Sequence, residues 1–274
     1  MSMRHVPMPA DAGDDVIIDQ CKRPGWDGYR ERWLAAAASY RDVRGDPWRI
    51  SAAKFSEAEA DELRDLYNRR RKNGPINRIR RPDGGFPSCP MCGSSGGRSL
   101  DHALPKALFP EFSIVRENLV PACTICNSDE KGAAYRGTRS PERHIHPYYD
   151  RWARHPIWQV QFGPDLDAVV FSAVPSPRLS MLRRRIVDYH LSSVLGAEWL
   201  DSSRRYWGSL PQLIRNRTGS SPSPGLVADE LRARLADETL EKGENGWHPA
   251  FLRGTLSDPR IPEYIALRIT VLPR

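Results

Sequence analysis

The chain has 274 residues, of which 39% are hydrophobic and 27% are charged, and it carries a net charge of +7 at pH 7. This length and composition are those of a soluble protein with one large domain or two small ones. The N-terminus lacks the apolar segment of a secretory signal, and no apolar run is long enough for a membrane helix. We therefore expect a cytoplasmic protein without a membrane partner. The basic charge favours nucleic acid as a partner, although many soluble proteins are equally basic.

The N-terminal third is expected to be helical. Residues 1–25 are polar and irregular and predict a loose arm, and residues 28–40 predict a first helix. Ser56 and Glu59 have the spacing of a capping box and predict a second helix that continues to about Lys72. Its end is a basic cluster, Arg69 to Lys72, which is equally typical of a solvated helix end and of a phosphate-contacting face.

The remaining elements lie on both sides of a motif-rich centre. Residues 73–88 are rich in Gly, Pro and Arg and predict a basic linker, and the alternating pattern of 157–174 predicts two strands. The chain after Pro177 is expected to be helical, with a polar break at 217–224 and another helix over 226–241. The tail near 262–272 is either helical or extended.

Four of the five cysteines form two close pairs. Cys89 and Cys92 make one Cys-x-x-Cys knuckle, and Cys123 and Cys126 make the other. Two such knuckles complete a tetrahedral four-thiolate site that suits a structural zinc ion. Four buried free thiols and an iron–sulfur centre are the weaker alternatives. Cys21 stands apart and is interpreted as a bystander.

Polar residues follow in a fixed order between and after the knuckles. Asp101 and His102 are adjacent, Asn118 begins the segment Asn-Leu-Val-Pro, Asn127 follows the last knuckle cysteine, and Lys131 comes four residues later. This order resembles the HNH endonuclease family, whose fold is a ββα-metal module. The resemblance extends to HNH effectors of bacterial restriction and phage-defence systems, for which an ATPase or another defence-system subunit is the expected partner.

The resemblance implies a role for each of these residues. His102 would be the general base that takes a proton from the attacking water, and Asn118 would tie a loop across the site and orient the His102 ring. Asp101 and Asn127 would hold a divalent cation, and Lys131 would meet a phosphate oxygen. The hard oxygen ligands favour Mg²⁺, with Mn²⁺ as a substitute.

These patterns together predict an α+β protein, mainly helical, around a central ββα-metal module with bound zinc. The expected regions are a helical part with the basic linker at 1–82, the nuclease module at 83–150, and a strand pair with helices at 151–274. The predicted function is metal-dependent hydrolysis of phosphodiester bonds in DNA. The alternative is a zinc-ribbon module that binds nucleic acid or a protein without cutting.

Two further groups of residues are weaker candidates. His144 and His146 are separated by one residue and could bind metal, although a packed strand edge is the more typical setting for such a segment. His146 is an outside candidate for a role near the phosphate. The run Arg183 to Arg185 fits a DNA-backbone contact and a solvated face equally well, and it specifies no base-reading module.

Overall fold

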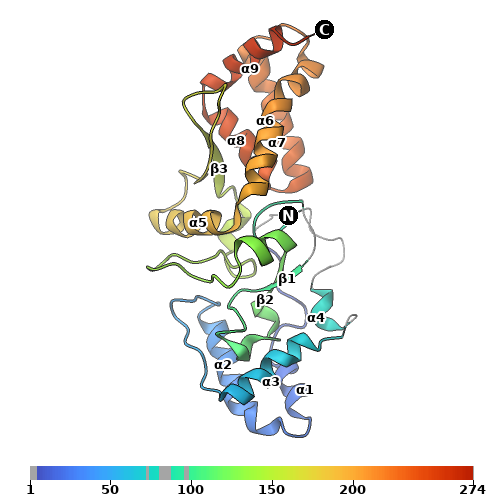
Figure 1. The fold of residues 1–274 in the computed structure, drawn as a ribbon, viewed down its shortest axis with the longest axis vertical. Coiled ribbons are helices and arrows are strands. Elements are labelled where there is room, and N and C mark those ends of the chain that lie inside the picture. Colours follow the sequence, from blue (N-terminus) through green and yellow to red (C-terminus); the bar gives the residue numbers. More distant parts are fainter. Residues whose placement is uncertain (1–4, 72–73, 80–87, 96–98, 274) are drawn as a thin grey trace.

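The computed structural model describes residues 5–71, 74–79, 88–95 and 99–273. The molecule is elongated, with an N-terminal helical part at one end, a C-terminal helical part at the other, and a hairpin between them (Figure 1). The first described residues do not pack with the N-terminal helices alone, because Val6 N donates to the Pro147 carbonyl. Most of the predicted basic linker over 73–88 lies outside the described residues.

The N-terminal part contains the elements α1 (Asp15–Cys21), η1 (Asp27–Tyr29), α2 (Arg30–Asp42), α3 (Glu57–Asn68) and α4 (Pro75–Arg78). The predicted capping box is present, because Glu59 N donates to Ser56 Oγ at 3.3 Å and Ser56 N donates to a Glu59 carboxylate oxygen at 2.7 Å. Two expectations were wrong. The segment 1–25 contains α1, whose Ile17 is fully buried, and α3 ends at Asn68 rather than near Lys72.

The centre is an antiparallel hairpin followed by a single helical turn. Strands β1 (Ser99–His102) and β2 (Leu119–Ala122) pair with Asp101 opposite Val120. The loop between them contains the short helices η2 (Pro110–Phe112) and η3 (Arg116–Asn118). After β2 the chain forms a π-helical turn, η4 (Cys126–Glu130), and further on the short helix η5 (Arg151–Arg154).

The C-terminal part begins with the predicted strand pair, β3 (Trp158–Phe162) and β4 (Phe171–Pro175), which are antiparallel. Its helices are α5 (Met181–Val194), α6 (Ala197–Thr218), α7 (Pro224–Lys242), α8 (Trp247–Ser257) and α9 (Arg260–Thr270). The predicted break lies between α6 and α7, and the tail is helical. Helix α8 was not predicted, because it contains a proline near its start and a glycine near its end.

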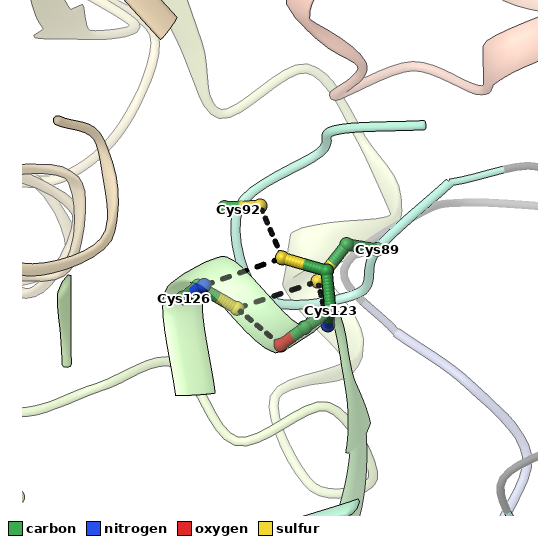
Figure 2. A group of neighbouring side chains, drawn as sticks. All are labelled: Cys89, Cys92, Cys123 and Cys126. Atoms are coloured by element: carbon green, nitrogen blue, oxygen red, sulfur yellow. Dashed lines mark hydrogen bonds between the residues drawn. The ribbon is translucent and has the colours of Figure 1, made fainter. Parts of the chain in front are cut away.

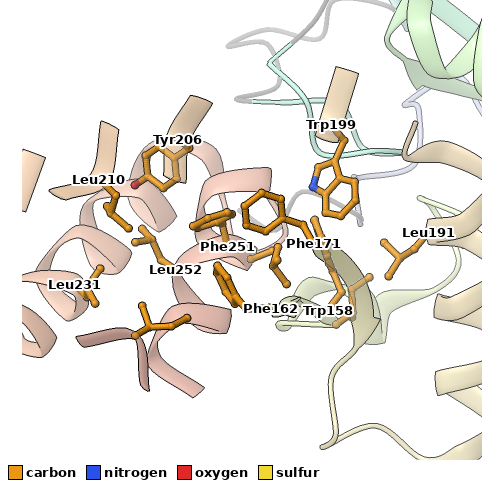
Figure 3. Close-up of a cluster of buried hydrophobic side chains, with 14 of the residues drawn as sticks. Trp158, Phe162, Phe171, Leu191, Trp199, Tyr206, Leu210, Leu231, Phe251 and Leu252 are labelled. Carbon is orange, nitrogen blue, oxygen red and sulfur yellow. The ribbon is translucent and has the colours of Figure 1, made fainter. Parts of the chain in front are cut away.

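Helix α8 packs on the strand pair, and helices α6, α7 and α9 pack against α8 around an aromatic core (Figure 3). Phe162 and Phe171 of the strands contact Phe251 of α8, with ring centroids 5.1 and 5.4 Å from it. A Cβ at Gly254 would lie 2.0 Å from the Val160 carbonyl oxygen, so only glycine lets α8 approach β3 this closely. Trp158 and Trp199 also lie in this core, and Trp207 packs against it.

The N-terminal helices share a second core with the hairpin, in which Ile17 and Trp33 pack with Leu100 and Leu119. The chain thus has the predicted α+β class, with helices on both sides of small antiparallel sheets. Among the described helices, none combines the length and the apolar character that a membrane span requires.

Candidate metal centre and catalytic site

The four knuckle cysteines meet at one point beside the hairpin (Figure 2). All four are buried, and their sulfur atoms lie within 4.8 Å of one another. The Sγ atoms of Cys89 and Cys126 are 3.6 Å apart, as are those of Cys92 and Cys123. Zinc–sulfur bonds of about 2.3 Å in a tetrahedron place the sulfurs about 3.8 Å apart. The cluster can therefore hold a metal ion, and its spacing fits zinc.

The backbone of each knuckle is folded to aim its sulfurs at the centre. Gly93 has φ of +84° and donates its N–H to the Cys89 carbonyl, which closes the first knuckle. This left-handed conformation favours glycine. Cys123 N donates to Cys89 Sγ at 3.1 Å, and Cys126 N donates to Cys123 Sγ at 3.3 Å. Such N–H donors stabilise thiolates, which are the metal-binding form of cysteine.

The chemistry of the cluster is compatible with a bound cation. Burial raises the pKa of the Cys89 thiol well above its ordinary value, because a thiolate without a counter-charge is unstable in an apolar surrounding. A bound divalent cation removes that cost and deprotonates coordinating thiols. Among the described residues, this is the one group of three or more Cys, His, Asp or Glu side chains with metal-binding spacing.

Asp101 and His102 occupy the last two positions of β1, where the strand ends and the loop begins. The Asp101 carboxylate is buried; its Oδ1 accepts the His102 backbone N–H at 2.7 Å, and its Oδ2 lies 2.9 Å from Lys131 Nζ. Oδ2 makes the ion pair without a well-aligned hydrogen bond. Burial raises the pKa of Asp101, and the charge of Lys131 opposes that rise.

Lys131 is buried and does not point to solvent, and its expected contact with a phosphate oxygen stays a prediction. Its side chain is 1% exposed, and Nζ contacts Asp101 Oδ2 and, at 3.3 Å, the His102 carbonyl. The cause is electrostatic: the buried Asp101 carboxylate needs a counter-charge, and η4 delivers the lysine to it. The structure therefore brings Asp101, His102 and Lys131 together.

The His102 ring is fixed by the loop that follows β1. Its Nε2 lies 3.0 Å from the Ser113 carbonyl and donates to it, and the other ring nitrogen, Nδ1, has no hydrogen-bond partner among the described residues. The Tyr67 ring of α3 packs edge-on against it at 4.5 Å. Burial, together with the charges of Lys106 and Lys131, lowers the pKa of His102 to about 4. The imidazole is consequently neutral at pH 7.

Asn118 holds this loop in place from the start of β2. Its Oδ1 accepts the Leu104 N–H at 2.8 Å, and its Nδ2 donates to the carbonyls of Leu104 at 3.0 Å and Phe112 at 3.2 Å. Phe112 precedes Ser113, which holds the His102 ring. The hydroxyl of Tyr40 in α2 donates to Asn118 Oδ1 at 3.2 Å. The side chain of Asn118 is completely buried, so it ties the loop across the hairpin.

Asn127 lies at the beginning of η4, beside the other end of β1. Its Nδ2 donates to Ser99 Oγ at 2.9 Å and to the Leu100 carbonyl at 3.3 Å. These two bonds orient the amide, and its Oδ1, the atom that binds cations, has no hydrogen-bond partner within the described part of the chain. These hydrogen bonds of Asn127 go to Ser99 and Leu100, whereas Asp101 is paired with Lys131.

Three side chains near His102 were not identified from the sequence as site residues. Arg70 lies over the Tyr67 ring at 3.9 Å, and Lys106 Nζ lies 5.2 Å from the same ring. Both charges lower the His102 pKa, which places them near the imidazole. Arg70 belongs to the predicted basic cluster, whereas Arg69 pairs with Asp65 on the helix surface. Tyr67 was not identified as a site residue because its position on the apolar face of α3 is typical of a core residue.

His144 and His146 are buried, and each forms a hydrogen bond with another part of the chain. His144 Nε2 bonds the Ala134 carbonyl at 3.2 Å, and His146 Nε2 bonds the Tyr40 hydroxyl at 2.9 Å. Burial lowers the pKa of each histidine to about 3. Neither histidine belongs to a metal-binding cluster of described residues. The packed-segment interpretation therefore fits both.

A 64-residue stretch of the chain is 45% identical to protein ea31 of Escherichia phage lambda. The match covers 23% of this chain and 21% of that protein. This chain thus spans about a fifth of the relative's length, and the relative's name states no activity. No family model and no solved structure matches the chain.

Proposed function

We propose that the protein is a metal-dependent endonuclease that hydrolyses phosphodiester bonds in DNA, with His102 as the general base. The observation that carries this proposal is the orientation of the His102 ring. Its Nε2 is committed to the Ser113 carbonyl, which leaves the Nδ1 lone pair free at the end of β1, next to Asp101. A neutral histidine held in one tautomer is the arrangement that general-base catalysis requires.

In this mechanism Nδ1 of His102 removes a proton from the water that attacks the phosphorus. The ring then carries a positive charge, and the Ser113 carbonyl stabilises it through the unbroken Nε2–H bond. Asn118 keeps that carbonyl in position through its bond to Phe112. Asn118 is therefore a positioning residue in this proposal.

Asp101 and Asn127 are the residues that would hold a divalent cation, Asp101 through Oδ2 and Asn127 through Oδ1. Oδ2 of Asp101 lacks a well-aligned hydrogen bond, and Oδ1 of Asn127 has no partner among the described residues. Both are hard ligands that suit Mg²⁺ or Mn²⁺. When bound, the cation stabilises the leaving oxygen and the charge on the phosphate. Without it, Lys131 neutralises Asp101, so a cation competes with Lys131 for the same oxygen.

Positive side chains around His102 support a phosphate-bearing substrate. Arg70 lies just after α3 and Lys106 lies in the loop after β1, and both approach the Tyr67 ring beside His102. Arginine and lysine here displace counterions from a nucleic-acid backbone. We further propose that the cysteine cluster carries a structural zinc, and that an ATPase or another defence-system subunit is the partner.

One observation favours the alternative, a zinc module that binds without cutting. The Asp101 carboxylate already has a counter-charge, since Lys131 Nζ lies 2.9 Å from it in a buried pair. A site whose charge is balanced by lysine does not require a catalytic cation. The two functions differ in whether a second metal binds and in whether DNA is cleaved.

The test combines Mn²⁺ binding, measured by electron paramagnetic resonance, with nicking of supercoiled plasmid in Mg²⁺ or Mn²⁺. We expect the wild-type chain to bind one Mn²⁺ and to nick, and Asp101→Asn and Asn127→Ala to lose both. Asp237→Asn is the matched control, because it removes a carboxylate exposed on α7. The assay is repeated with neighbouring gene products, as an effector requires its partner. Plasmid binding without Mn²⁺ uptake or nicking would support the non-cutting module.

A further inference from the structure

An open cavity of about 720 Å³ lies away from the hairpin site, at the middle of the molecule. Four segments enclose it: the N-terminal segment, the turn after α2, the residues around η5, and the first turn of α5. His102 and the knuckle cysteines are not among its lining residues. The cavity is thus separate from the candidate catalytic site and from the metal centre.

The lining contains four arginines, Arg44, Arg151, Arg154 and Arg183, and neither Asp nor Glu. All four are exposed, and none forms an ion pair with an acidic residue in the described ranges. Four unpaired guanidinium groups around one cavity concentrate positive charge there. Such a group of forked donors is the arrangement that binds phosphate oxygens.

The carboxylate next to Arg151 in the sequence does not neutralise this charge. Asp150 precedes Arg151, but both of its oxygens bond the guanidinium of Arg143, at 2.7 and 2.9 Å. They also accept the His146 N–H and the Trp152 indole N–H. Asp150 is buried and Arg143 is nearly so, so this pair is complete without the cavity arginines.

Aromatic rings form part of the same wall. The Trp152 indole is held by its bond to Asp150 at 3.1 Å, and the Arg183 guanidinium lies 5.3 Å from its centre. The Tyr149 ring is half-buried, with its centroid 4.7 Å from that of His146. Fixed rings beside phosphate-binding arginines offer stacking surfaces for a nucleobase.

The backbone around the cavity is held before any ligand binds. Arg44 has φ of +57°, a left-handed conformation that is costly for a side chain other than glycine. The N-terminal segment is fixed by His5 Nδ1 and Val6 N, which both bond the Pro147 carbonyl at 2.9 Å. Tyr148 donates to the Leu119 carbonyl at 2.7 Å. The cavity is thus preformed, which lowers the entropic cost of binding.

We propose that this cavity binds a nucleoside phosphate, either as a free nucleotide or as part of a nucleic-acid strand. The arginines bind the phosphate, and Trp152 and Tyr149 stack on the base. The volume lies in the usual range of small-ligand sites and exceeds what a bare phosphate needs. Nothing in this inference depends on whether His102 catalyses cleavage.

The test measures binding by the full chain without added Mg²⁺, using labelled single-stranded oligo(dT), ATP and inorganic phosphate as separate probes. Arg151→Gln/Arg154→Gln removes two cavity charges, and Trp152→Leu removes the stacking surface. The matched control is Arg205→Gln/Arg217→Gln, which removes two exposed arginines of α6 outside the cavity. All variants are first compared by thermal unfolding.

We expect the cavity double variant to weaken binding about tenfold or more, with a flatter salt dependence, while the α6 control stays within about twofold. Trp152→Leu should weaken nucleoside-phosphate binding about tenfold without changing the affinity for inorganic phosphate. Binding of ATP alone identifies a free nucleotide as the source, and binding of oligo(dT) alone identifies a strand. Equal losses in both double variants, no effect of Trp152→Leu, or no binding of either nucleoside phosphate would overturn the proposal.

Discussion

At the residue scale, the candidate site depends on which atom of each side chain is already bonded. His102 uses Nε2 for the Ser113 carbonyl, Asn127 uses Nδ2 for β1, and Asp101 uses Oδ1 for a backbone N–H. The atom proposed to remove a proton or to bind the cation is the second polar atom of each side chain: Nδ1 of His102, Oδ1 of Asn127 and Oδ2 of Asp101. The sequence gives the residue types, and only the folded loop determines which atom remains.

Buried histidines make the stability of this fold depend on pH. The pKa of His144 is lowered to about 3 by burial and by the charges of Lys131 and Arg143, whereas an unfolded histidine has a pKa near 6.5. Below pH 6.5 the unfolded chain therefore binds a proton that the folded chain does not. Stability is fully present above pH 6.5 and decreases as the pH falls towards 3.

We predict that His144→Gln reduces this loss. Between pH 6.5 and 5, its free energy of unfolding should fall by about 2 kcal/mol less than that of the wild type, since one fewer proton is taken up. Urea unfolding at both pH values measures the difference, and effects common to both chains, such as zinc release, cancel. His155→Gln, at an exposed histidine, is the control. An unchanged pH dependence in His144→Gln would contradict the buried neutral ring.

At the element scale, several features could be predicted because local chemistry decides them. The Ser56–Glu59 capping box, the strand pair over 157–174 and the two cysteine knuckles each depend on residues close in sequence. Helix α1 was missed because its amphipathic signal is short and its stability comes from burying Ile17 in the N-terminal core, where α1 contacts η1 and α2. The inward turn of Lys131 depends on Asp101, thirty positions away, and no local pattern specifies it.

The knuckles are the element whose removal should matter most. Cys89→Ser should lose the metal and unfold the hairpin region, because a structural zinc contributes its binding free energy to folding. Cys21→Ser is the matched control, since Cys21 is a buried thiol outside the cluster. Elemental analysis should find one zinc per wild-type or Cys21→Ser chain. Clearly less than one in the wild type would contradict the four-cysteine site.

At the scale of the whole molecule, distant segments support the metal centre. The Trp247 indole of α8 donates to the Cys92 carbonyl at 2.7 Å, and His190 of α5 bonds the Met91 carbonyl at 2.7 Å. The expected regions 83–150 and 151–274 are therefore connected at the first knuckle, and the boundaries of all three expected regions stay a prediction. These hydrogen bonds could not be predicted from the sequence, because a tryptophan or a histidine in a predicted helix is most simply interpreted as a core residue.

The hydrogen bond from Trp247 to the first knuckle predicts that a substitution in α8 changes the rate of zinc release. Trp247→Phe keeps the ring but removes the N–H donor, so the first knuckle should release zinc to a chelator about tenfold faster. Trp207→Phe is the control, because that ring packs in the aromatic core with Phe162 and Phe251. Release is followed with a colorimetric zinc indicator. Equal rates for Trp247→Phe and the wild type would show that the knuckle is held without this bond.

The proposed nuclease function depends most on His102 acting as the general base at a cleavage site. The most direct measurement is single-turnover cleavage of plasmid DNA in Mg²⁺ by chains of equal zinc content, comparing wild type, His102→Ala and His155→Ala. We predict that His102→Ala cleaves at least about 100-fold more slowly, as expected for loss of a general base, while His155→Ala cleaves at the wild-type rate. Cleavage by His102→Ala at the wild-type rate would contradict the proposed role of His102 as the general base.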